Sequence, residues 1–253
     1  MTRAFLLSAA VLGSLAVASA HADSVGSLQV NRASLTTKFG DAVCAAGTPA
    51  TTLCFRNVGG GVVAGLGKVT TAYTLIYDNF GSACGHVHAE IPIVVPGKGE
   101  IDLAMRSTAC ITPDDPGHFP ASTVTVSGGS GLYANASGSG VLDTQSSHGA
   151  AGGIGTHTWT ATIDVVGLTF DTTPPQIAGA TSKVVKTRLA AGARVRYSVS
   201  ATDATDGAVP AACRLKSGSV FRVGRTTVAC SAVDGSGNTA TARFVITVKR
   251  VRR

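Results

Sequence analysis

The stretch CSAVDGSGNTATARFVITV, residues 230–248, decides the fold of the C-terminal part of the chain. From Ala240 to Val248 every second side chain is apolar, and threonine, arginine and valine lie between them. This period of two predicts a β-strand with one buried face. A similar run ends at Ala232, and the turn-forming residues Asp234 to Asn238 separate the two runs. The stretch is therefore predicted to form a β-hairpin.

Another alternating run lies upstream, in ARVRYSVSA, residues 193–201. Its apolar side chains are predicted to face inward and its arginines outward. The inward residues are Val195, Tyr197, Val199 and Ala201, and the outward ones are Arg194 and Arg196. Several short strands within about 80 residues are typical of a β-sandwich.

Three segments together resemble a known family: DTTPPQI (171–177), SATDATDGAVPAAC (200–213) and SGSVFRVGRTTVACSAVDGSGNTATARFVITV (217–248). Their order and spacing resemble an HYR (hyalin repeat) module, which is an immunoglobulin-like β-sandwich. The resemblance covers nearly all of residues 171–250 and implies a disulfide between Cys213 and Cys230. HYR modules are usually extracellular adhesion or spacer units, so the resemblance brings no catalytic residue.

Three aspartates of this region, Asp203, Asp206 and Asp234, allow two interpretations. They can cap turns through hydrogen bonds to nearby backbone N–H groups. They can also be read as calcium ligands, but Ca²⁺ takes six to eight oxygens and the pair Asp203 and Asp206 supplies only two side chains. We expect the turn role.

The N-terminal 22 residues are predicted to be a secretory signal peptide. Arg3 precedes an apolar run, Ala4 to Val17, that is too short to span a bilayer. Small-residue cleavage sites follow at residues 18–20 and 20–22. The alternative is a buried N-terminal helix. We expect a secreted, extracellular protein, and association with the cell surface is a second expected location. We expect no transmembrane segment in the mature chain. Arginine outnumbers lysine two to one, which favours a GC-rich bacterial source.

Charge divides the rest of the chain into two halves. Residues 23–170 carry 6 basic and 10 acidic side chains, whereas residues 171–253 carry 14 basic and 4 acidic ones. The change falls at FDTTPPQI, residues 170–177, where two prolines break regular structure. We therefore predict two domains, residues 23–170 and residues 171–253.

The first of these domains is also predicted to be all-β. KVTTAYTLIY (68–77) and THTWTATIDVV (156–166) each place apolar side chains at alternate positions. GGSGLYANASGSG, residues 128–140, resembles the glycine-rich hairpin of allene oxide cyclase and dirigent proteins. That resemblance implies a small closed β-barrel, which can enclose an apolar ligand.

A second hairpin is predicted in ACGHVHAEIPIVVPGKGEIDLAMRSTAC, residues 83–110, around the turn PGKG. Placing Val94 opposite Glu100 puts the apolar positions of both strands on one face, and His88 then faces Arg106. On the polar face, His86, His88 and Glu90 have a spacing that can bind zinc. The neighbouring arginine disfavours a metal there, so we expect no metal and a solvent-facing polar surface.

Six cysteines follow the predicted signal peptide, and an even number in an exported chain predicts three disulfides. The hairpin register brings Cys84 opposite Cys110, which predicts a bridge between them. Cys44 and Cys54 are then left to close a small loop.

The basic C-terminal half is predicted to attract anionic polymers, such as cell-wall polymer or acidic polysaccharide. The candidate contacts are Arg194, Arg196, Arg243, Lys249, Arg250, Arg252 and Arg253. We expect no specific nucleic-acid partner, because no aromatic residues that could stack on bases lie among these arginines and lysines.

No catalytic motif, phosphate-binding loop or dinucleotide fingerprint is present, so no catalytic residue and no cofactor are expected. We expect a non-catalytic binding or adhesion protein with an HYR module and a barrel-like binding domain. The alternative is an exported enzyme whose barrel holds an apolar substrate. A third possibility is a structural component of the cell envelope. A deep lumen lined by histidine, tyrosine or carboxylate groups would favour the enzyme, and a lumen filled by side chains would favour a binding or structural role.

The predicted export can be tested on the secreted protein. We expect N-terminal sequencing to find a mature chain that starts near His21 or Asp23, because the small-residue sites precede these positions. Thiol titration should find no free thiols. An exported chain that still carries Met1, or that titrates six thiols, would contradict the prediction.

Overall fold

The structure is a computed structural model that describes residues 25–79, 84–109, 118–147 and 153–251. None of these residues is helical, and most lie in β-strands. The signal peptide, Cys110 and the last two arginines, Arg252 and Arg253, lie outside the described residues, so the predictions made for them stay predictions.

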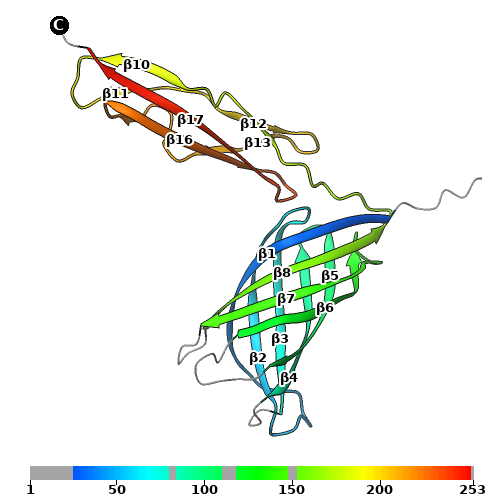
Figure 1. Ribbon diagram of the computed structural model, residues 1–253. Helices are drawn as coiled ribbons and strands as arrows, with labels where there is room; N and C mark the ends of the chain where they lie inside the picture. The colour runs from blue at the N-terminus through cyan, green and yellow to red at the C-terminus, as the bar shows by residue number, and fades with distance from the viewer. Residues whose placement is uncertain (1–24, 80–83, 110–117, 148–152, 252–253) are drawn as a thin grey trace, which may run out of the picture.

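The N-terminal part is a closed barrel in which each strand pairs with the next one along the chain (Figure 1). All of its ladders are antiparallel. The strands are β1 (Val25–Ala42), β2 (Leu53–Val63), β3 (Gly67–Asp78), β4 (Gly85–Val95), β5 (Gly99–Ala109), β6 (His118–Gly131), β7 (Ser137–Ser147) and β8 (Gly153–Val166).

The alternation in the sequence decides which side chains fill the barrel. In β3 the side chains at 69, 71, 73, 75 and 77 are buried, and in β8 those at 157, 159, 161, 163 and 165 are buried. The predicted inward faces of both segments are confirmed. The interior includes Ile93, Ile101 and Ile163, whose exposed fractions are 0%. Burial of this apolar surface is the main stabilising contribution.

The first and last strands close the barrel. β1 pairs with β8 from Val25 to Phe39, with a register shift between Val30 and Ala33. Arg32 lies in this irregularity with a positive φ of 50°, and its backbone N–H donates to Thr160 Oγ1. A bulge of this kind bends a strand and increases its twist, as a long strand that wraps around a small barrel requires.

The register predicted for the β4–β5 hairpin is confirmed residue for residue. Val94 pairs with Glu100, and His88 pairs with Arg106. The ladder ends with Gly85 opposite Ala109, one residue before the predicted cysteine pair. Cys84 is disulfide-bonded. Because Cys110 lies outside the described residues, the bridge between Cys84 and Cys110 remains a prediction.

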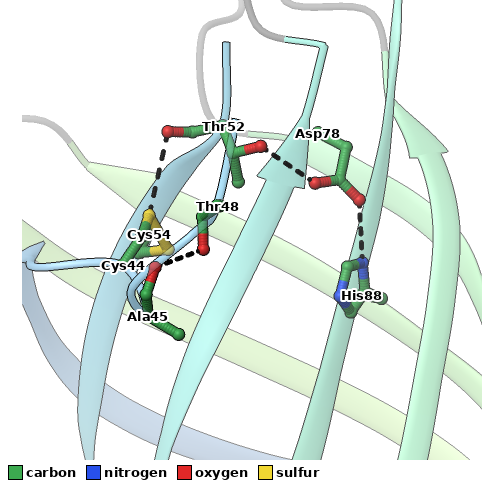
Figure 2. The surroundings of a disulfide bond; sticks show 7 residues. All are labelled: Cys44, Ala45, Thr48, Thr52, Cys54, Asp78 and His88. Atoms are coloured by element: carbon green, nitrogen blue, oxygen red, sulfur yellow. Dashed lines mark hydrogen bonds and ion pairs between the residues drawn. A yellow bond between two sulfur atoms is a disulfide. The ribbon is translucent and has the colours of Figure 1, made fainter. Parts of the chain in front are cut away.

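A disulfide joins Cys44 to Cys54 at the end of the barrel where β2 begins (Figure 2). Beside it, Thr52 Oγ1 donates to Asp78 Oδ1 at 3.2 Å, and Asp78 Oδ2 lies 3.3 Å from His88 Nδ1. The predicted pairing of these two cysteines is confirmed. The bridge and the polar contacts tie the loop between β1 and β2 to strands β3 and β4.

The glycine-rich segment forms the β6–β7 hairpin, as predicted. Gly131 has a φ of 59°, and Gly138 has a φ of 141° with no room for a Cβ next to Thr162 O. Both positions therefore require glycine. The tip of the hairpin folds inward, because Tyr133 and Ala136 are only 2% and 6% exposed.

The C-terminal part consists of three small sheets, with strand orders β10-β17-β16-β14, β11-β15 and β13-β12-β9. The predicted hairpin of residues 228–248 is confirmed as β16 and β17, and Cys213 pairs with Cys230 in a disulfide. The strands are β9 (Gln176–Ala178), β10 (Lys183–Thr187), β11 (Ala193–Arg194), β12 (Ser200–Asp203), β13 (Gly207–Val209), β14 (Ala211–Cys213), β15 (Val220–Phe221), β16 (Gly224–Val233) and β17 (Thr239–Arg250).

Two details of this part differ from the sequence-based expectation. The run 193–201 is not one strand, because β11 ends at Arg194 and β12 begins at Ser200. Between them the backbone bonds to a loop instead of a ladder, since Tyr197 N–H donates to Ser217 Oγ. In addition, β17 does not end at Val248. It continues to Arg250, because it pairs in parallel with β10.

The two parts contact each other at one end of the barrel (Figure 1). Gly65 N–H, in the turn between β2 and β3, donates to Ser236 O at 2.8 Å in the loop between β16 and β17. The connecting segment between β8 and β9 contains the two prolines and has no strand. The proposed division into separately folding domains at residue 170 stays a prediction.

Nowhere in the described ranges is there a helix with the length and apolar character needed to span a membrane.

Replacing a lumen residue tests both the filled barrel and the division into domains. Val124 is 2% exposed and Val141, on the next strand, is 48% exposed. We expect Val124→Ala to lower the free energy of unfolding of the barrel by about 2 kcal/mol, because buried methyl groups are lost and a cavity remains. Val141→Ala is the matched control and should change it by less than about 0.5 kcal/mol.

The measurement is urea unfolding followed by the fluorescence of Trp159, the single tryptophan of the chain. A separate transition of the C-terminal half, followed by circular dichroism, should not shift in either variant. Equal losses in both variants, or a shared transition that moves as one, would contradict the account.

Candidate functional site

The barrel lumen is the first candidate site, because the barrel-type resemblance implies a cavity there. Its apolar side chains come from strands on every side of the barrel and form one continuous core. A few buried polar groups lie among these apolar side chains, in the part of the lumen that contains Thr37 of β1 and His157 of β8. The buried polar residues that line this part are Thr37, Asn57, Thr71, Tyr73, Thr144 and His157.

His157 is the centre of a hydrogen-bond network inside the barrel. Its Nε2 lies 2.8 Å from Thr37 Oγ1 and 3.3 Å from Tyr73 OH. Its Nδ1 lies 3.1 Å from Thr144 Oγ1. Thr37 Oγ1 also donates to Asn57 Oδ1 at 3.1 Å. The network therefore connects four strands, β1, β2, β3 and β7, to β8 through one imidazole.

Burial sets the protonation states of this network. Removal from water lowers the pKa of His157 to about 4, because the charged imidazolium loses its hydration. The same cause raises the pKa of Tyr73 well above its ordinary value. Both groups are therefore neutral at physiological pH. A neutral histidine held by three hydroxyls is suited to structural hydrogen bonding.

The space beside this network is small. A cavity of about 20 Å³ is lined by Thr71, Tyr73, His157, Trp159 and apolar side chains. A water molecule needs roughly 10–15 Å³ measured in this way. Thr71 Oγ1 and Trp159 Nε1 are buried and have no hydrogen-bond partner. The cavity can thus hold about one water, which both groups can bind, but no apolar substrate.

The zinc candidate His86, His88 and Glu90 lies on the outer face of β4. His86 and Glu90 are exposed, and His88 contacts Asp78. Successive outward residues of a strand are roughly 7 Å apart, which is too far for one metal to bind all three in this conformation. The structure does not bring their ligand atoms together.

The predicted polyanion contacts are divided between several surfaces. Arg243 and Lys249 point outward from the β10-β17-β16-β14 sheet. Arg194 lies on β11, where its Nη1 donates to Gly218 O at 2.7 Å. Arg196 is exposed between strands, and Arg250 is exposed at the end of β17.

Sequence analysis missed two basic residues on the same outer face. Lys186 pairs with Lys249, and Arg225 pairs with Thr247, so both side chains lie beside those of β17. We call Lys186, Arg225, Arg243 and Lys249 the basic face. The signal was present in the alternation of GRTTVACSAV, 224–233, whose outward positions include Arg225. Lys186 could not be placed before β10 was known to pair with β17.

Asp203, Asp206 and Asp234, which were expected to cap turns, accept hydrogen bonds from nearby backbone N–H groups, and their carboxylates also lie close together. Asp203 Oδ1 accepts from the N–H groups of Thr205 and Asp206, and Asp234 Oδ1 accepts from Asn238 N–H. One carboxylate oxygen from each of four aspartates lies within 4.8 Å of the others: Asp171, Asp203, Asp206 and Asp234. Asp171 was not among the residues singled out from the sequence.

Comparison with known proteins supports the C-terminal resemblance. The family model of the HYR domain matches residues 170–248. The match confirms the HYR resemblance drawn from the sequence, and the closed barrel is compatible with the second, weaker resemblance. HYR domains and disulfides are typical of extracellular proteins. No curated protein and no solved structure matches the chain.

The buried histidine predicts a pH-dependent stability. Above its unfolded pKa of 6.5, His157 is neutral in both states. As pH falls from about 6.5 towards about 4, the unfolded chain takes up a proton that the folded barrel does not, so the folded state loses stability. The whole loss is on the order of 3 kcal/mol, reached near the folded pKa and below.

Urea unfolding at several pH values in this window, followed by Trp159 fluorescence, measures the slope. His157→Gln should flatten it, whereas His86→Gln, which alters an exposed histidine, should leave it unchanged. A wild-type slope that survives in His157→Gln would show that another group causes it.

Proposed function

We propose that this protein is a secreted, non-catalytic binding or adhesion protein. In this proposal the HYR domain serves as an adhesion or spacer unit, and the barrel is a rigid body that presents its outer wall and loops. The observation that carries the proposal is the HYR match over residues 170–248, next to a barrel whose interior is filled by its own side chains.

The filled lumen supports a binding role over the alternative of an exported enzyme. An enzyme with an apolar substrate needs a concave site of several hundred Å³. The cavity beside His157 is about 20 Å³. The pair His157 and Tyr73 is the only arrangement in the described barrel interior that resembles acid–base machinery, and both groups are buried and neutral.

The basic face supports an anionic partner. Lys186 and Lys249 are directly paired across two strands, and like charges in that arrangement repel each other. A bound polyanion relieves this repulsion. Because many weak contacts contribute and salt screens each one beyond roughly 10 Å at 0.1 M, binding should be strongly salt-dependent.

Heparin chromatography of the mature chain tests this partner class. We expect the triple variant Arg225→Gln, Arg243→Gln, Lys249→Gln to elute at distinctly lower salt than the wild type, because it removes three of the four charges of the basic face. Substitution is preferable to removal of the last five residues, since Lys249 and Arg250 pair with β10 and Val251 N–H donates to Thr187 O.

The matched control neutralises three cations of the barrel, Lys38→Gln, Arg56→Gln and Lys68→Gln. It should elute with the wild type, because the N-terminal half carries net negative charge. If both triple variants shift equally, net charge alone explains retention and the basic face is not a binding surface. If neither triple variant shifts, the proposal of a polyanion partner is wrong. The filled lumen and the adhesion role do not depend on this result and are tested separately.

A further inference from the structure

We propose that the four converging aspartates, Asp171, Asp203, Asp206 and Asp234, form a Ca²⁺ site that fixes the junction between the two parts of the chain. One carboxylate oxygen from each lies within 4.8 Å of the others. Oxygens bound to one Ca²⁺ at about 2.4 Å are at most about 4.8 Å apart, so the four oxygens meet the separation that a shared ion requires. This inference does not depend on the proposed function.

Two buried carboxylate oxygens of this group have no hydrogen-bond partner. Asp203 is only 7% exposed, and its Oδ2 is buried with no hydrogen-bond partner. Asp171 Oδ2 is also buried and without a partner. Turn capping does not account for them, because it uses the other oxygen, Oδ1, of each residue. A charged oxygen left unpaired away from water is costly, and a cation would satisfy both.

The charge pattern of the C-terminal half is the next argument. Residues 171–253 contain four acidic and fourteen basic side chains, and all four acids belong to this one group. Within the ranges that the structure describes, none of them forms an ion pair with lysine, arginine or histidine. Four carboxylates at this separation repel each other strongly unless a positive charge lies between them.

The surrounding backbone holds the carboxylates in place. Gly235 N–H donates to Asp206 Oδ2 at 2.8 Å, and Asn238 Nδ2 donates to Asp234 Oδ2 at 2.9 Å. The N–H groups of Thr205 and Asp206 both donate to Asp203 Oδ1, at 2.8 and 3.1 Å, and so hold its carboxylate in place. A site positioned before the ion arrives loses less conformational entropy on binding.

The donor set selects the ion. Every side-chain ligand is a carboxylate, with no histidine or cysteine in the group. Oxygen donors suit hard cations, whereas Zn²⁺ prefers nitrogen and sulfur. Four carboxylates can supply four to eight oxygens, as Ca²⁺ requires. Mg²⁺ needs a strict octahedron and keeps several waters, so it should bind more weakly.

The site joins three segments at the junction. Asp171 lies in the connection that follows β8, and Asp234 begins the loop between β16 and β17. Asp203 is the last residue of β12, and Asp206 lies in the turn that follows it. The same loop contacts the barrel through Ser236 O, and Asn238 Nδ2 donates to Asp171 O at 3.0 Å. A bound ion therefore ties the connection to the loop that rests on the barrel.

The experiment is calorimetric titration of the calcium-free mature chain with CaCl₂, with MgCl₂ as comparison. We expect saturable binding of one Ca²⁺ per chain, and weaker binding of Mg²⁺. Asp203→Asn and Asp206→Asn should each lower the Ca²⁺ affinity by about tenfold or more, since affinity follows the number of charged ligands. Asparagine keeps one oxygen as an acceptor for the backbone bonds. The control Asp41→Asn changes an exposed carboxylate of β1 and should bind as the wild type does.

A second measurement follows the junction directly. Ca²⁺ should slow proteolytic cleavage between residues 167 and 175 in the wild type and in Asp41→Asn, but not in Asp206→Asn. Asp206 is exposed, so this variant keeps the test valid if Asp203→Asn does not fold. Absence of saturable Ca²⁺ binding by the wild type, equal affinity for Mg²⁺, or unchanged affinity in Asp206→Asn would each overturn the proposal.

Discussion

The pairing of β1 with β8 is the constraint on which the N-terminal structure depends. The other strands pair only with their neighbours along the chain, so this pairing closes the eight strands into a ring without free edges. It also brings residues about 130 positions apart, such as Val30 and Ala161, into one ladder. Once the ring is closed, every inward side chain must fit within a fixed volume. Trp159, Tyr77, Met105 and several isoleucines are buried in that volume, and the cavity beside His157 measures about 20 Å³. The interior then stabilises the fold, and for this reason we propose that binding occurs on the outer surfaces.

The C-terminal half places its basic and its acidic side chains in different regions. The four residues of the basic face lie on outward positions of the sheet and form no ion pair among the described residues, and the four acidic side chains meet at a single place near the loop that contacts the barrel. If acids and bases were distributed evenly, most would form weak surface ion pairs that contribute little. The observed separation instead gathers positive charge on one face and negative charge at one end, and these are the places where we propose an anion and a cation to bind.

Local patterns in the sequence predicted the parts of the fold that depend on neighbouring residues. The β4–β5 register followed from a short turn and two alternating faces, and the β16–β17 hairpin followed in the same way. The closed barrel was expected from the resemblance of residues 128–140, but the strands that close it were not, because nothing in Val25–Ala42 indicates pairing with a strand more than a hundred residues later. β10 was missed since KVVKT shows no clear alternation and pairs in parallel with the last strand.

The candidate sites show the same limit. The faces that carry His157 and Arg243 were predicted, but not the partners that surround them, such as Thr37 and Lys186, which come from distant strands. Three of the four aspartates were noticed, and each looks like a turn residue when only its neighbours are considered. Their convergence with Asp171 depends on how the connecting segment packs against the loop at Asn238, which is a tertiary contact.

The central claim is that the barrel lumen is closed to ligands, so that binding occurs on the outside. Titration of the folded protein with an apolar fluorescent probe tests this directly, because Trp159 lines the remaining cavity and can transfer excitation to a probe nearby. The account predicts no saturable binding and no energy transfer from Trp159 while the protein stays folded. Stoichiometric uptake of the probe with quenching of Trp159 would contradict it and would favour an enzyme or a carrier of apolar molecules.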